Sequence, residues 1–277
     1  MTRPAFPILL VLILIASAAC RAQTPISCPN SKGYNRIQHI GGYSVQVSPG
    51  VKASPTDQCR GVVAGPGGLR AIFARSWSLW IDDITGNDIN QGGAPDVVFD
   101  SYTGNQGCCF EYTIVSLGKS PAIVRKIRNQ VPLYFRKQPD GSIVIRAGDG
   151  AFDLFLLSRS ESVLPQVSLR LEGSELTDVS DEFTPEYDEK IAKARDELTP
   201  AALGKFRSSD FHQQMYVDQR ETVKRVLTVV LNYLYSGREK QAWQALDEMW
   251  PPADESRVRS LIVERRNRGL LAQLGNP

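Results

Sequence analysis

Histidine is nearly absent from this chain, which has only His39 and His212 among its 277 residues. A Ser-His-Asp or Cys-His catalyst needs a histidine that is held by an acid beside a nucleophile. No Gly-x-Ser-x-Gly elbow accompanies either histidine, and the chain has no complete P-loop and no Gly-x-Gly-x-x-Gly dinucleotide fingerprint. The sequence therefore contains no recognisable catalytic constellation, and our prediction leans against an enzyme.

An excess of charge of either sign is also missing. The chain has 32 basic and 30 acidic residues, a formal net charge of +2, and the two signs are well mixed. Nucleic-acid binders concentrate lysine and arginine on one face, so we expect no nucleic-acid partner. Beyond the N-terminal region, no apolar segment is long enough to span a membrane.

The N-terminal 22 residues have the order of features that a signal peptidase recognises. Arg3 provides the positive charge, residues 6–15 form an apolar core, and small residues follow over 16–22. Cleavage after Ala22 is expected, and Ala18 and Ala19 are alternative sites. The sequence therefore predicts an exported protein, periplasmic or extracellular.

Cys20 supports an alternative, in which the chain is a lipoprotein anchored at the cell surface. Ala18 and Ala19 directly precede this cysteine, as small residues precede a lipidated cysteine. Ser17, however, stands three residues before it, where such signals usually have leucine. Simple secretion is the preferred prediction, and Cys20 is the candidate lipidation site.

Four cysteines remain after cleavage: Cys28, Cys59, Cys108 and Cys109. An oxidising compartment favours disulfides, and four cysteines allow three connectivities. Pairing of Cys28 with Cys59 leaves Cys108 and Cys109 as a vicinal disulfide, as free thiols or as small buried side chains. The adjacent pair is also a candidate redox element. Zinc binding is not expected, because the spacing of these cysteines is not that of zinc ligands.

The pattern of apolar residues changes near residue 182, which predicts an α+β protein. Short alternating or apolar runs between Gly and Asp turns predict strands from about residue 43 to 179, including 69–81, a hairpin over 131–146 and a run at 152–157. Helical periodicity and start signals predict helices at 186–198, 218–235, 238–249 and 255–268. We therefore expect a signal peptide (1–22), a β-rich propeller-like or sandwich domain (23–181) and C-terminal helical hairpins (182–277).

The loop that follows the strand ending at residue 81 is rich in oxygen-bearing side chains. Calcium needs six to eight oxygen ligands from a tightly turning loop, and Asp83, Thr85, Asn87 and Asp96 fit that requirement. These four residues are the candidate metal ligands, and calcium is the candidate cofactor. The alternative is an Asx-rich connecting loop, in which Asp, Asn, Thr and Gly serve the turn itself.

This loop resembles the FG-GAP and related calcium-loop repeats of integrin-like β-propellers. Asp83, Thr85 and Asn87 match the first three ligand positions, Asp96 matches the closing one, and the resemblance covers about residues 77–117. It implies a calcium-stabilised blade. The chain departs from the pattern by an insertion at residues 88–92 and by a neutral side chain at Asn87, and the motif does not recur elsewhere.

A second, weaker resemblance lies in the helical part. Residues 237–251 resemble the second helix of a tetratricopeptide repeat, with Gly237, Ala242 and Leu246 at the turn, small and large packing positions. Such solenoids need about three units, so a plain helical hairpin is the alternative.

These features predict an exported, non-enzymatic binding or structural protein with a protein or glycan partner. The alternative is an extracellular metal- or carboxylate-dependent hydrolase that uses acidic residues such as the neighbours Asp82 and Asp83.

Overall fold

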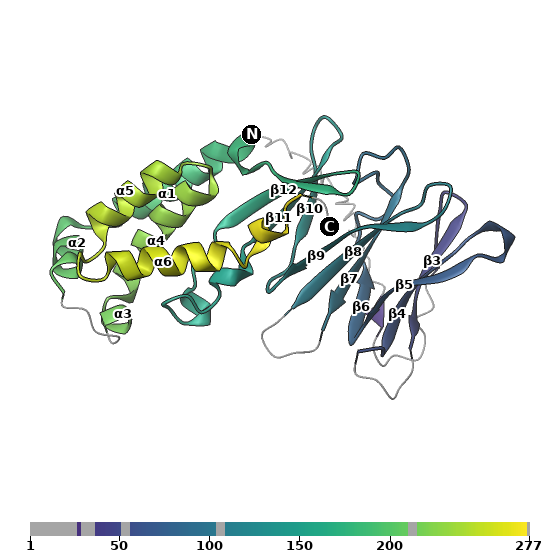
Figure 1. The fold of residues 1–277 in the computed structure, drawn as a ribbon, viewed down its shortest axis with the longest axis horizontal. Helices are drawn as coiled ribbons and strands as arrows, with labels where there is room; N and C mark the ends of the chain where they lie inside the picture. The colour runs from purple at the N-terminus through teal and green to yellow at the C-terminus, as the bar shows by residue number, and fades with distance from the viewer. Residues whose placement is uncertain (1–26, 29–36, 51–55, 104–108, 210–214, 276–277) are drawn as a thin grey trace, which may run out of the picture.

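The structure is a computed structural model that describes residues 27–28, 37–50, 56–103, 109–209 and 215–275. The predicted signal peptide, Cys20, Cys108 and His212 lie outside these residues. The described strands form three antiparallel sheets beside a group of helices, so the predicted α+β class is confirmed (Figure 1). In the described part of the chain no sheet closes on itself.

The central sheet has the order β1-β6-β7-β8-β9, and its strands are β1 (Ser27–Cys28), β6 (Ser78–Ile81), β7 (Asp96–Tyr102), β8 (Phe110–Ser116) and β9 (Ala122–Asn129). A second sheet contains β2 (Ile37–Ile40), β3 (Tyr43–Pro49), β4 (Cys59–Ala64) and β5 (Arg70–Ser76). The third contains β10 (Tyr134–Lys137), β11 (Ile143–Gly148), β12 (Gln166–Glu172) and β13 (Glu175–Asp178).

The central sheet and the β2–β5 sheet pack face to face. Alternation along β3 buries Val45 and Val47, which share one apolar cluster with Leu79 and Phe99 of the central sheet. Gly61 on β4 makes room for the packing, since a Cβ there would lie 2.7 Å from the ring of Phe99. The predicted strand 69–81 supplies both sheets, because it divides at Trp77 into β5 and β6.

The opposite face of the central sheet belongs to a second cluster, which also includes the β10–β13 sheet and the helices. Tyr112 of β8 packs against Phe135 of β10, with 6.0 Å between ring centroids. Figure 1 shows the β10–β13 sheet between the helices and the other two sheets. One apolar core therefore extends across residue 182, although the division into two domains there stays a prediction.

The helices are α1 (Thr184–Asp196), α2 (Pro200–Arg207), α3 (Met215–Asp218), α4 (Arg220–Tyr235), α5 (Glu239–Met249) and α6 (Glu255–Arg266). Thr199 caps α2 by accepting a hydrogen bond from the Ala202 amide. The N-cap residues of α1 and α6 are Phe183 and Asp254, and neither side chain makes a capping hydrogen bond. The apolar residues whose helical periodicity predicts the helix at 218–235 form the buried face of α4. Gly237 adopts φ 77° between α4 and α5 and takes the left-handed turn that glycine favours. No helix of the described residues is long and apolar enough to cross a membrane.

The predicted strand at 152–157 is wrong. This segment starts in the 3-10 helix η2 (Gly150–Phe152) and continues as turns up to η3 (Arg159–Glu161). Asp149 caps η2 by accepting the Ala151 amide. The run contains enough apolar residues for a strand, but periodicity cannot distinguish a short apolar run from a buried turn.

Asp149 is fully buried and links the sheet region to the helices. Its carboxylate accepts hydrogen bonds from the Tyr235 hydroxyl at 2.7 Å and from the amides of Ala151 and Leu270 at 3.0 and 3.2 Å. Burial raises the pKa of Asp149 above its usual value. Gly269 lies against this carboxylate, where a Cβ would be 2.1 Å from Oδ2.

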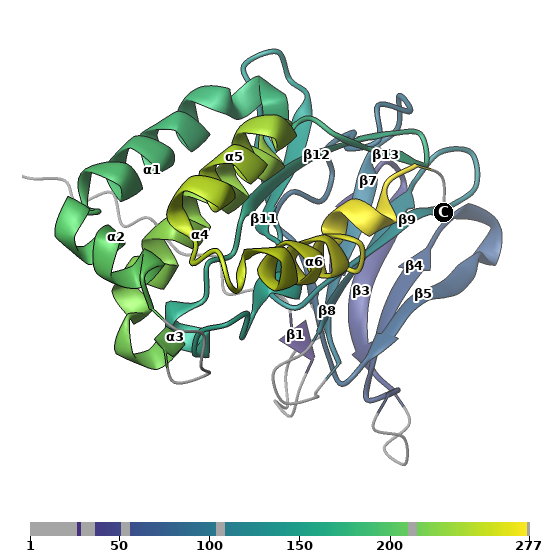
Figure 2. The same ribbon diagram turned by 60° about the vertical axis from the view of Figure 1, so that its left-hand side comes forward.

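The C-terminal segment after α6 returns to the sheets through η5 (Leu270–Gln273) (Figure 2). The buried Arg125 of β9 donates hydrogen bonds to the main-chain carbonyls of Ser174, Gln273 and Gly275. Gly275 pairs with Leu176 through two backbone hydrogen bonds. The segment thus joins the edge of the central sheet to the edge of the β10–β13 sheet.

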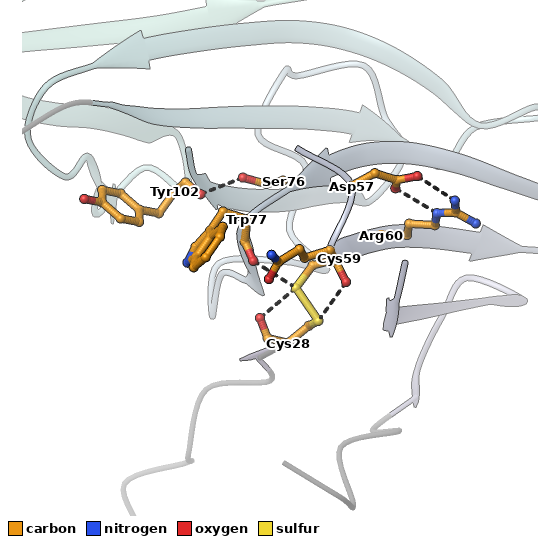
Figure 3. Close-up of a disulfide and its surroundings, with 8 residues drawn as sticks. Cys28, Asp57, Cys59, Arg60, Ser76, Trp77 and Tyr102 are labelled. Atoms are coloured by element: carbon orange, nitrogen blue, oxygen red, sulfur yellow. Dashed lines mark hydrogen bonds and ion pairs between the residues drawn. A yellow bond between two sulfur atoms is a disulfide. The ribbon is translucent and has the colours of Figure 1, made fainter. Parts of the chain in front are cut away.

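A disulfide joins Cys28 to Cys59, with 5.7 Å between their Cα atoms (Figure 3). It ties the start of the described chain to β4, next to the ion pair between Asp57 and Arg60. Cys109 is also disulfide-bonded, and its partner lies outside the described residues. Cys109 therefore carries no free thiol in this structure.

Candidate functional site

Two of the four predicted calcium ligands, Asp96 and Thr85, accept hydrogen bonds from backbone amides. Asp96 is fully buried at the start of β7, and its Oδ2 accepts the amides of Ile89 and Asn90 at 2.7 and 3.0 Å. Thr85 Oγ1 accepts the amide of Val98. These oxygens satisfy backbone donors within the loop and the strand that follows it.

The other two predicted ligands behave differently. Asn87 uses its side-chain nitrogen to donate to the Ile84 carbonyl at 2.7 Å, whereas Asp83 is exposed. Asp88 accepts the amides of Gly92 and Gly93. These hydrogen bonds are those of an Asx-rich loop, while Asp96 Oδ1 is buried without a hydrogen-bond partner among the described residues, and calcium binding by the loop stays a prediction. Among the described residues, no three His, Cys, Asp or Glu side chains gather closely enough to hold a metal ion.

A pocket of about 360 Å³ lies at the base of this loop, and we call it the acidic pocket. It is lined by three carboxylates and by two aromatic and one aliphatic side chain: Asp82, Asp83, Asp100, Trp80, Phe110 and Ile81. The three carboxylates line one pocket without converging on a point. Their position beside two aromatic side chains makes this pocket the candidate functional site.

Strand register brings these residues together. Trp80 on β6 lies opposite Asp100 on β7, and the Asp82 amide donates to the carbonyl of Val98, two residues before Asp100. Because side chains alternate between the faces of a sheet, Asp82 and Asp100 are diagonal neighbours on one face. Phe110 of β8 lies opposite Tyr102 of β7 and extends this face.

Asp100 has the most perturbed acidity in the pocket. Its pKa is raised from 3.8 to about 7, first by burial and then by the negative charge of Asp82, while the Tyr112 hydroxyl offsets part of this rise. Its Oδ1 is buried and accepts no hydrogen bond in the described part of the chain. Burial also raises the pKa of Asp82, although the Ile84 amide donates to its Oδ1 at 2.9 Å. At neutral pH, Asp100 therefore exists as a mixture of its acid and carboxylate forms.

The chemistry of the pocket follows from its side chains. Carboxylates and aromatic faces together bind organic cations, through ion pairing and cation–π contacts. A carboxylic acid with a strongly raised pKa beside a second carboxyl group is also the arrangement that serves general acid–base catalysis. The geometry thus supports cation binding first and proton transfer second.

The sequence pattern identified Asp82 as a candidate catalytic acid, but together with its chain neighbour Asp83. The structure shows that the partner on the same face is Asp100, which no sequence pattern had marked. An acidic residue inside the apolar strand 96–102 was the available signal, but its significance depends on the register with β6. His39 lies exposed on β2, in a different sheet from the acidic pocket.

Comparison with known proteins gives no relative from which a function could be transferred: no family model, curated protein or solved structure matches this chain.

Proposed function

We propose that this chain is an exported, non-enzymatic binding protein, and that its acidic pocket binds a cationic group of a protein or glycan partner. The main support for this proposal is that three carboxylates and two aromatic side chains line one pocket. The N-terminal sequence pattern supports export, and the disulfide between Cys28 and Cys59 is compatible with an oxidising compartment.

A cationic ligand relieves the main electrostatic cost of the pocket. Asp82 and Asp100 repel each other when both are ionised, and this repulsion contributes to the raised pKa of Asp100. An ammonium or guanidinium group between them lowers that pKa and releases a proton from Asp100. The affinity for the cation therefore rises between pH 6 and pH 8, because protonation of Asp100 no longer competes with binding of the cation.

The test is calorimetric titration with N-acetyl-lysinamide and N-acetyl-argininamide, with neutral N-acetyl-norleucinamide as the ligand control. Replacing Asp82→Asn should weaken binding of the cationic probes about tenfold, about 1.4 kcal/mol. The matched protein control is Glu172→Gln, which removes an exposed acid on β12 outside the pocket. Equal binding of the neutral probe, or equal losses in both variants, contradicts the proposal.

The calcium-stabilised β-domain implied by the FG-GAP resemblance is a separate part of the proposal. A cation that binds only the folded state raises the melting temperature by mass action. The measurement is thermal melting with millimolar calcium and with chelator, for the wild type and Asp83→Ala. Asp83 is the informative position because it is exposed, whereas Asp96→Ala also removes acceptors for two backbone amides. Superimposed wild-type curves would end the calcium proposal.

A carboxylate-dependent hydrolase is the second candidate function, and the raised pKa of Asp100 beside Asp82 favours it. In this mechanism Asp100 donates a proton to the leaving group while Asp82 acts as the base or nucleophile. A screen of glycoside and ester substrates tests it. Turnover that Asp100→Asn abolishes, while the variant keeps its fold, supports hydrolysis over simple binding.

A further inference from the structure

A second pocket lies far along the chain from the acidic pocket, between the η2–η3 turns, α3 and α6. Its volume is about 650 Å³, and we call it the leucine groove. The lining is mostly aliphatic and aromatic, with Leu154, Phe155, Leu156, Val217, Leu261 and Arg265 as its main residues. Leu154 is 54% exposed and Val217 is 57% exposed, so the groove presents apolar side chains to solvent.

The backbone of the groove is strained at two leucines. Leu154 and Leu156 both have φ 58°, a left-handed conformation that is unfavourable for a bulky L-residue. The strain directs the buried Phe155 into the core and leaves Leu154 exposed and Leu156 partly so. Strained residues of this kind persist where the surroundings hold them and are concentrated at ligand sites.

Specific contacts hold this strained segment in place. The Leu154 amide donates to Ser162 Oγ at 2.8 Å, and that hydroxyl donates to the Ser158 carbonyl at 3.0 Å. Asp153 forms an ion pair with Arg159 at 2.9 Å. The groove is therefore preformed, so a ligand would not have to order it.

The groove also carries a positive charge from Arg265 of α6. This guanidinium donates to the Ala151 carbonyl at 2.9 Å and lies 5.8 Å from the centre of the Phe155 ring. In the described residues it has no acidic partner within ion-pair distance. Arg257 also lines the groove, but it has an acidic partner: its Nε donates a hydrogen bond to the buried Asp254 carboxylate at 2.6 Å.

We propose that the leucine groove binds the anion of a free fatty acid. The aliphatic chain lies along Leu154, Leu156, Val217 and Leu261, and the carboxylate pairs with Arg265, whose planar fork matches two carboxylate oxygens. Charge complementarity selects this occupant, since an apolar groove with an unpaired guanidinium favours an anionic head over a neutral or cationic one. The inference is independent of the acidic pocket, which has the opposite charge.

The experiment is calorimetric titration of the full exported chain with monomeric dodecanoate, compared with dodecyltrimethylammonium and with a neutral dodecyl glucoside. Dodecanoate is expected to bind at least tenfold more tightly than the other two. Arg265→Gln should remove that preference, while binding of the neutral probe stays unchanged. Leu154→Ser should weaken binding of all dodecyl probes, and Leu274→Ser is the control because Leu274 is also an exposed leucine but lies outside the groove.

Three outcomes overturn the proposal. One is equal binding of anionic and cationic probes, and another is a dodecanoate affinity that Arg265→Gln leaves unchanged. The third is stronger, Leu154-dependent binding to anionic phospholipid vesicles, which would make a membrane surface the occupant. Val217→Ser provides a second groove variant on α3, since its exposed side chain can be replaced without opening the core.

Discussion

The replacement Asp100→Asn tests the electrostatics of the acidic pocket directly. Asparagine has nearly the shape of aspartic acid but cannot ionise. In the wild type, burial and the charge of Asp82 raise the pKa of Asp100 from 3.8 to about 7. An acid whose pKa is raised on folding stabilises the protein fully below its unfolded-state pKa, and that contribution is lost as the pH rises through the folded-state pKa. The variant should therefore gain stability relative to the wild type as the pH rises.

The magnitude follows from the same values. At about 1.4 kcal/mol per pH unit, the interval from 3.8 to about 7 corresponds to roughly 4 kcal/mol. Asp100 is only partly buried, so solvent screening reduces this, and we expect about 2 kcal/mol. For a chain of this length, that is a rise in melting temperature of about 4 to 8 °C at pH 8, with no difference near pH 4.

The assay is urea unfolding of wild type and variant from pH 4 to pH 8, comparing only their difference so that other titrating groups cancel. Asp82→Asn is the companion variant: it should reduce the pH dependence, because the charge of Asp82 is the second cause of the raised pKa. A difference between Asp100→Asn and wild type that does not change with pH would refute the reasoning. A variant less stable than the wild type at pH 8 would do the same.

Three further predictions concern the framework around the pockets. Gly269→Ala should cost about 2 kcal/mol or more in urea unfolding, because the new Cβ would lie 2.1 Å from the buried Asp149 carboxylate, whereas Gly204→Ala, with open space around it, should be neutral or stabilising. Replacing both cysteines of the β1–β4 disulfide by serine should lower the unfolding free energy by about 3 to 4 kcal/mol, since the bridge closes a loop across a separation of 31 residues, and an unchanged melting temperature would contradict this. Arg125→Met should release the C-terminal segment from β9 and accelerate amide hydrogen exchange there, while exchange in α4 stays slow.

Local patterns in the sequence were sufficient for several elements. The stripe over 218–235 corresponds to α4, which starts at Arg220 and ends at Tyr235. The Asp140-Gly141 turn of the predicted hairpin is present, with Gly141 at φ 88° and the Ser142 amide bonded to Asp140. Capping, helical period and turn chemistry involve residues within a few positions of one another, so a single sequence contains the information.

The same local information was insufficient at two places. Residues 152–157 looked like a strand because they are apolar, but Phe152 and Phe155 are buried by Tyr235 and the other residues of the shared core, which needs no strand there. The loop over 82–96 carries the oxygens of a ligand set, but the sequence could not show that Thr85 and Asp96 accept hydrogen bonds from the adjoining backbone, and calcium binding there stays a prediction. In both cases the composition could be read from the sequence, but the direction in which each side chain points could not.

The sequence by itself determined the α+β class, most helix boundaries, the turns and the expectation of export and disulfide formation, because these depend on composition and short-range periodicity. Only the tertiary structure decided which acids share a pocket: Asp82 and Asp100 are separated by the whole loop and meet through the register of β6 with β7. It also decided that the η2–η3 turns meet α3 and α6 to form the leucine groove. Strand register and the docking of distant segments depend on the summed burial of many side chains, and one short stretch of sequence does not contain that sum.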